Sequence, residues 1–138
     1  MKATILLSLF AATYAVITDC GWENSVFEFQ SGTLTPDPPV LYKDFYVAIT
    51  LKNNGPPVTN GTIAHNVYVN GFQVYTDVTS LCDYVECPID SGVSTLTMTG
   101  KWSHNIGKRV SIKSMWYDDM NNVLLCARTD MSFNIWPF

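Results

Sequence analysis

A β-hairpin is encoded by the stretch Val67-Tyr68-Val69-Asn70-Gly71-Phe72-Gln73-Val74. An Asn-Gly dipeptide between two alternating runs is typical of a two-residue type I′ turn, because both central residues of that turn need a positive φ. Folding the chain about the dipeptide pairs Val69 with Phe72 and Val67 with Val74. All four apolar side chains then share one face, so the hydrophobic pattern and the register of the turn agree. We expect a half-buried antiparallel hairpin here.

Other short runs with the same alternation lie on both sides of the hairpin. In Phe45–Leu51, every second side chain is apolar, and clusters of Pro, Asn and Gly bound the run. Further strands are predicted at Val26–Phe29, Leu96–Trp102, Arg109–Tyr117 and Val123–Phe133, with a turn at Asp118–Asn122. About seven short strands without helical periodicity predict an all-β antiparallel sandwich.

The first fifteen residues resemble a secretory leader. Lys2 supplies a positive charge, Ile5–Ala12 is apolar, and Ala15 is a small residue suited to cleavage. The apolar run is shorter than the ~20 residues that a membrane-spanning helix needs. We therefore predict a signal peptide at 1–15 and one mature domain at 16–138, which is exported.

The predicted domain contains an even number of cysteines. In an oxidising compartment this favours two disulfides among Cys20, Cys82, Cys87 and Cys126. Zinc is the alternative, but His65 and His104 are the only histidines available as further ligands. Four cysteines allow three pairings; proximity favours Cys82–Cys87, which leaves Cys20 for Cys126.

The charge and the sequence motifs exclude several functions. The net charge of −4 becomes −5 once Lys2 is removed, and no basic stripe is present, so neither nucleic acid nor strong electrostatic capture by an anionic membrane is expected. The motif Asn60-Gly61-Thr62 predicts a glycan on Asn60. No catalytic, phosphate-binding or metal-binding motif occurs, so we predict no enzyme activity, no cofactor and no metal site. His65 is interpreted as a surface or packing residue.

Several short motifs occur together in an order that is informative. They are Asp19-Cys20-Gly21, Pro38-Pro39-Val40, Leu81-Cys82-Asp83, Cys87-Pro88-Ile89 followed by Gly92, and the segment Asp119–Cys126. Their order and spacing resemble the ML lipid-recognition domain family. Within it, the chain is similar to the phosphatidylglycerol/phosphatidylinositol transfer proteins and to the Niemann–Pick type C lysosomal sterol-binding protein.

The resemblance implies an immunoglobulin-like sandwich with the bridges Cys20–Cys126 and Cys82–Cys87 and an apolar cavity between its sheets. It also implies a monomeric carrier of a phospholipid, sterol or fatty acid that contacts membranes transiently and serves sterol or phospholipid transport. Such a carrier is expected to be secreted or to reside in the endolysosomal lumen. The chain lacks the extra cysteine pair of the sterol-binding members and the prolines that usually interrupt the segment matching Trp102–Gly107.

The residues that line the cavity are predicted from strand alternation. They are Val67, Val69, Phe72, Val74, Leu96, Met98, Trp102, Ile112 and Trp116. Two alternatives stay open. The same aromatic side chains could fill a dry core in an extracellular recognition domain, or the sandwich could display a microbial lipid to an innate-immunity receptor.

Overall fold

A computed structural model describes residues 15–21, 25–37, 39–40, 42–101 and 109–132. Within these residues the chain forms eight strands and one short helix. In chain order they are β1 (Ala15–Asp19), β2 (Phe27–Thr35), β3 (Asp44–Asn53), β4 (Thr62–Val69), β5 (Phe72–Ser80), α2 (Leu81–Tyr84), β6 (Gly92–Lys101), β7 (Arg109–Tyr117) and β8 (Val123–Ser132). The predicted leader, apart from Ala15, lies outside the described residues.

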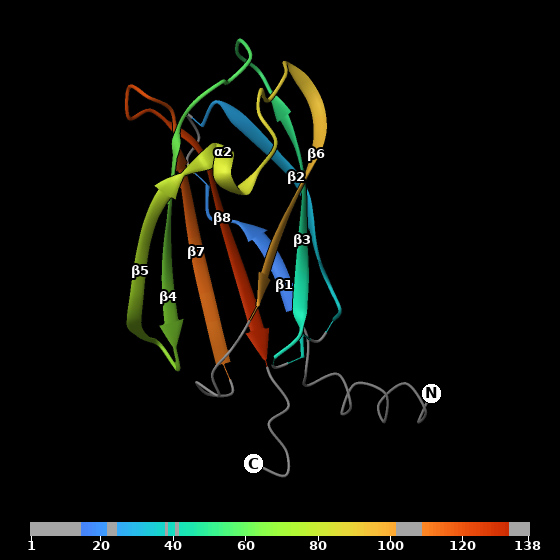
Figure 1. Ribbon diagram of the computed structural model, residues 1–138, viewed down its shortest axis with the longest axis vertical. Coiled ribbons are helices and arrows are strands. Elements are labelled where there is room, and N and C mark those ends of the chain that lie inside the picture. Colours follow the sequence, from blue (N-terminus) through green and yellow to red (C-terminus); the bar gives the residue numbers. More distant parts are fainter. Residues whose placement is uncertain (1–14, 22–24, 38, 41, 102–108, 133–138) are drawn as a thin grey trace.

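The strands form two antiparallel sheets that face each other, as the sequence predicted (Figure 1). One sheet has the order β1-β8-β7-β4-β5, and the other has the order β2-β3-β6. The additional strand relative to the prediction is β1, which pairs with β8 from Ala15 to Asp19. It begins at the last residue of the predicted leader. No helix among the described residues is long and apolar enough to cross a membrane.

One long edge of the sandwich is closed. There β1 lies so close to β2 that a Cβ on Gly32 would come within 2.6 Å of Ile17 Cγ2. The backbone N–H of Cys20 donates to the carbonyl of Cys126 at 3.1 Å, and a disulfide joins the same two residues. This disulfide and the Cys82–Cys87 bridge confirm the predicted pairing. Gly32 therefore allows the two sheets to meet along this edge, where the Cys20–Cys126 bridge ties the end of β1 to β8.

The opposite long edge is open. It is formed by β5, the last strand of the five-stranded sheet, and by β6, the last strand of the three-stranded sheet. No β-ladder joins these two strands in the described part of the chain. Figure 1 shows them apart, with α2 across the upper end of the space between them. Along this edge, no paired strand of the described residues covers the inner faces of the two sheets.

Several large, fully buried side chains form the core at the α2 end. Trp116 is fully buried, and its ring meets the edge of Phe27 at a centroid separation of 6.3 Å. Ile63, Leu81 and Leu125 are also buried beside them. This end of the sandwich is a conventional hydrophobic core.

The central turn of the hairpin is confirmed. Asn70 and Gly71 have φ values of 50° and 88°, and Val69 lies opposite Phe72. Glycosylation of Asn60 remains a prediction. The residue is exposed in the loop before β4, where a glycan could be attached.

Candidate functional site

A cleft lies between the two sheets on the side of the open edge. Its volume is about 290 Å³, near the lower limit of the ~300–1,000 Å³ typical of ligand sites. It is lined by Phe45, Val47 and Ile49 of β3, His65 and Val67 of β4, Tyr75 and Asp77 of β5, Tyr84 of α2, Met98, Thr99 and Gly100 of β6, Ile112 and Ser114 of β7, and Ala127, Thr129 and Met131 of β8. The cleft thus draws on both sheets and on the helix.

Most of the cleft wall is apolar. The lining positions alternate along β3, β4, β5, β7 and β8, whereas β6 contributes the consecutive residues Met98, Thr99 and Gly100. In β3, Val47 and Ile49 are buried and face inward, while the intervening Ala48 lies on the other face. Val67 and Ile112 occupy opposite positions of β4 and β7 and form the facing wall. Such a wall favours a ligand with a hydrocarbon chain, at about 0.8 kcal/mol for each methylene buried.

Three of the residues predicted to line a cavity do so, namely Val67, Met98 and Ile112. Leu96 is buried and Val69 is half-buried, but both pack with the core and lie outside the cleft lining. Trp102 lies outside the described residues. The prediction therefore drew on four of the strands that line the cleft, β4 to β7, and did not include β3, β8 or α2.

Trp116 packs in the core at the α2 end of the sandwich. Its ring contacts Phe27 and does not line the cleft. Alternation placed it on the correct face of β7, two positions from Ser114, which does line the cleft. Whether an inward side chain of β7 lies in the core or lines the cleft depends on its position along the strand and on what the opposite sheet places there.

Phe72 and Val74 lie on the surface, with 76% and 57% of their area exposed. The predicted pairing of Val67 with Val74 is wrong. Gln73 pairs with Tyr68, but Val67 pairs with Tyr75, so Val74 is the extra residue of a β-bulge. Beyond the bulge the side chains that face inward are shifted by one position, and Tyr75 takes the place expected for Val74.

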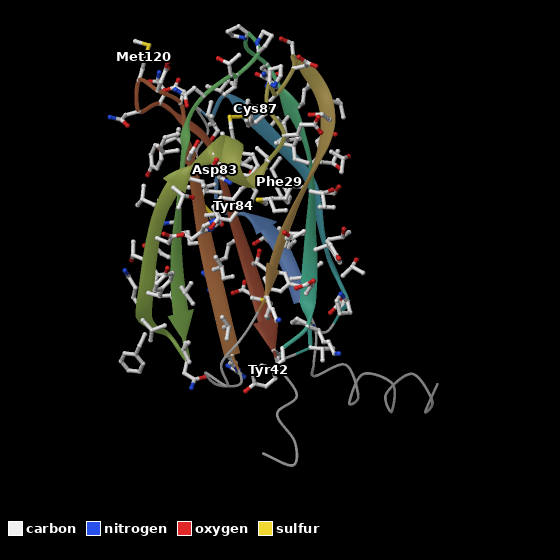
Figure 2. The ribbon with its side chains drawn as sticks, viewed as in Figure 1. Phe29, Tyr42, Asp83, Tyr84, Cys87 and Met120 are labelled. Carbon is white, nitrogen blue, oxygen red and sulfur yellow. A yellow bond between two sulfur atoms is a disulfide. The ribbon has the colours of Figure 1, made fainter. Side chains whose placement is uncertain are left out.

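The prediction included none of the polar side chains that line the cleft, and four of these lie together. Asp77, His65 and Ser114 are directly opposite one another on β5, β4 and β7, and therefore form one row across the inner face of the sheet. Tyr84 joins them from α2, and Figure 2 shows it beneath the helix, between the strands of the two sheets. We call these four residues the polar row. Alternation along β4 predicts that Val67 points inward, and it predicts the same for His65. This pattern could have identified His65 as a cleft residue from the sequence.

The polar row is internally connected. His65 Nδ1 lies 2.9 Å from Ser114 Oγ, and the His65 ring meets the ring of Tyr84 edge to face at 5.0 Å. The Tyr84 hydroxyl donates to Asp77 Oδ2 at 3.4 Å. Ser114 is buried, whereas the other three residues are half-buried. The row thus runs from the open edge to the interior.

Burial sets the protonation of the row. Desolvation lowers the pKa of His65 below its usual value of 6.5, and the negative charge of Asp77 opposes this effect only in part. Desolvation also raises the pKa of Tyr84, so its hydroxyl keeps its proton at neutral pH. At neutral pH the row therefore presents a neutral imidazole and a protonated phenol beside Ser114 and Asp77.

The lowered pKa of His65 makes the stability of the protein depend on pH. As the pH falls below about 6.5, the unfolded chain takes up a proton on this residue before the folded chain does, so the free energy of unfolding falls by up to about 1.4 kcal/mol per pH unit. His65→Gln should remove this part of the slope in urea unfolding between about pH 5.5 and 8. Asp77 and Tyr84 face His65 in both proteins, and His104 is also common to both, so their contributions largely cancel. Identical slopes in the two proteins would contradict the assignment.

The polar row contains the residue types of a hydrolytic triad, but its geometry suits binding. Ser114 lies in β7, which is hydrogen-bonded to β4 on one side and β8 on the other, so its backbone N–H is used by the sheet and is not free to stabilise an oxyanion. Among the described residues, no three His, Cys, Asp or Glu side chains are grouped so that they could hold a metal ion.

A larger hollow of about 910 Å³ lies beside the hairpin turn and the adjoining ends of β7 and β8. Arg109, Arg128 and Asp130 line it, and Arg128 and Asp130 form an ion pair at 3.0 Å. Because an apolar chain placed there would meet charged side chains, we assign ligand binding to the smaller cleft.

Comparisons with known proteins agree with this architecture. The family model described as the ML domain matches residues 15–133. The structure is similar to a Niemann–Pick type C2 protein from Japanese carpenter ant, with a TM-score of 0.64 and 12% identity over 86% of this chain and 99% of that chain. It is also similar to chicken MD-1 in complex with lipid IVa, with a TM-score of 0.60 and 10% identity over 87% of this chain and 90% of that chain. No curated protein matches the chain in sequence.

Proposed function

We propose that this chain, which belongs to the ML-domain family, holds one lipid molecule in the cleft between its sheets and carries it in solution. The observation that supports this most directly is an apolar cleft that opens between two unpaired edge strands. The candidate ligands are a phospholipid, a sterol or a fatty acid, with their apolar part inside the cleft. Catalysis is not part of this proposal.

The surface around the cleft supports exchange of lipid at a membrane. On β5, Phe72 and Val74 are exposed, and Tyr75 reaches from the surface into the cleft lining. An apolar rim of this kind favours brief contact with a bilayer, and the negative net charge keeps the contact weak when the lipids are anionic. We infer a monomer that acts outside the cell or in the endolysosomal lumen, as two disulfides suit.

Display of a lipid to a receptor is the second candidate function. It is supported by the similarity to MD-1, whose structure contains lipid IVa. A carrier and a display protein both need the cleft, so blocking the cleft tests their common requirement. They differ in whether the loaded protein returns its lipid to vesicles.

The cleft can be blocked by Ala127→Phe, since Ala127 is buried and lines the base of the cleft. Loss of contact with only two methylenes, at about 0.8 kcal/mol each, lowers affinity about tenfold. We expect the variant to lose at least that much affinity for lipid, as measured by displacement of a fluorescent fatty acid and by native mass spectrometry. Vesicle-to-vesicle transfer should fall to the spontaneous rate.

The matched control is Ala48→Phe, which adds the same group on the outer face of β3 between two cleft-lining residues. This variant should bind lipid as the wild type does. If overpacking prevents Ala127→Phe from folding, Val67→Phe fills the cleft from the neighbouring strand β4. Undiminished lipid binding in a folded cleft-filled variant, or no lipid binding by the wild type, would overturn the proposal.

A further inference from the structure

The polar row occupies a defined place in the cleft. Asp77, His65 and Ser114 share one level of the five-stranded sheet, and Tyr84 covers that level from α2. The adjacent level, toward the hairpin end of the sheet, carries Tyr75, Val67 and Ile112. A ligand that fills the cleft therefore meets the polar row at the α2 end. Along the rest of its length it meets a mainly apolar wall, which also contains Thr99 and Thr129.

These groups match a partner that both donates and accepts hydrogen bonds. The Ser114 hydroxyl can do either, and the contact with Ser114 uses His65 Nδ1, which leaves His65 Nε2 available. Asp77 accepts a hydrogen bond from Tyr84 and has further lone pairs. A ligand hydroxyl placed here can accept from one of these residues and donate to another.

The charge of the row discriminates against an anionic ligand. Asp77 carries the only formal charge among the described side chains that line the cleft, and it is negative. No lysine or arginine lines the cleft within the same residues, and His65 is neutral at pH 7 because burial lowers its pKa. A carboxylate or phosphate at this level would meet Asp77 without a compensating cation.

We propose that the polar row is a subsite for the hydroxyl group of an uncharged single-chain lipid, such as a fatty alcohol or a monoacylglycerol. This inference rests on the proposed function and narrows its ligand class. The hydrocarbon chain lies along Val47, Val67 and Ile112, and the hydroxyl lies against His65 and Ser114. The small cleft volume, about 290 Å³, suits one chain.

The test compares three probes of equal chain length: dodecanol, dodecane and dodecanoate. We expect the wild type at about pH 7.5, where the fatty acid is ionised and His65 is neutral, to bind dodecanol about tenfold more tightly than either of the others, as a hydrogen bond made away from water allows. Ser114→Ala should lower the affinity for dodecanol about tenfold and leave the affinity for dodecane unchanged. Ser111→Ala is the matched control, because Ser111 lies on the same strand, three residues away, and hydrogen-bonds Asp130 on the outer face.

A second variant tests the role of charge through an expected gain of affinity for an anionic probe. Asp77→Asn keeps the shape of the side chain and an acceptor for Tyr84 but removes the negative charge. We expect it to raise affinity for dodecanoate about tenfold while dodecanol affinity changes little. An unchanged dodecanoate affinity would contradict the argument from charge.

The outcomes separate this inference from the proposed function. If the wild type binds all three probes equally and Ser114→Ala behaves like Ser111→Ala, the polar subsite is wrong and the lipid-binding function stands. If the wild type binds none of the three probes and extracts no lipid from vesicles, the proposed function itself fails. Cleavage of monopalmitin that is lost in Ser114→Ala would replace the binding role of the row with a catalytic one.

Discussion

Replacing both Cys20 and Cys126 by alanine is expected to lower the free energy of unfolding by about 4–5 kcal/mol, most of the stability of a typical small domain. The bridge spans 106 residues, so on the chain-entropy model its removal releases a large part of the unfolded chain from constraint. It also ties β1 to β8 beside the backbone hydrogen bond from Cys20 to Cys126. Urea unfolding at equilibrium measures the loss.

The second disulfide provides the comparison. Cys82 and Cys87 are 5 residues apart, so replacing both by alanine should cost only about 2 kcal/mol on the same model. The difference between the two double variants tests loop length, because each removes two cysteines. Equal losses would show that the long bridge stabilises the fold by some other means than closing the chain.

Trp116→Ala is expected to lower the free energy of unfolding by about 3–5 kcal/mol, because it opens a large void in the core. The side chain is fully buried and its ring packs on the edge of Phe27. Phe72→Ala, which also removes an aromatic ring, should change stability by less than about 0.5 kcal/mol since Phe72 is 76% exposed. Urea unfolding of both variants gives the comparison.

Lipid binding by a milder variant distinguishes a core role of Trp116 from a role in the binding site. Trp116→Phe should fold, with some loss of stability, and bind lipid as the wild type does, because Trp116 lies outside the cleft lining. A selective loss of lipid affinity in this variant, without a comparable loss of stability, would return Trp116 to the binding site, as alternation alone had suggested.

Local sequence determined several features of this protein by itself. The turn at Asn70-Gly71 formed as predicted, because a two-residue connection with positive φ at both positions suits few other residues. The strand Phe45–Leu51 has the predicted inward face, since alternation is a property of a single strand. The order and spacing of the cysteine motifs indicated the family and both disulfides. Each of these signals is contained within a short stretch or in its spacing along the chain.

Only the tertiary structure decided which inward side chains meet a ligand. The bulge at Val74 depends on how β5 pairs with β4, and it moved Tyr75 to the position predicted for Val74. Trp116 and Ser114 share one face of β7, but the first faces a packed core and the second faces a cleft. The cleft exists because β1 and β2 close one edge while β5 and β6 leave the other open.

The polar row shows the same division between sequence and tertiary structure. His65 and Ser114 are 49 residues apart, and their hydrogen bond exists because β4 pairs with β7 in one particular register. Alternation along either strand specifies only which way each side chain points, so it marks both residues as inward without showing that they meet. Register between distant strands is set by the packing of the whole sandwich, and that packing places a neutral histidine, a serine and a carboxylate side by side in an apolar cleft.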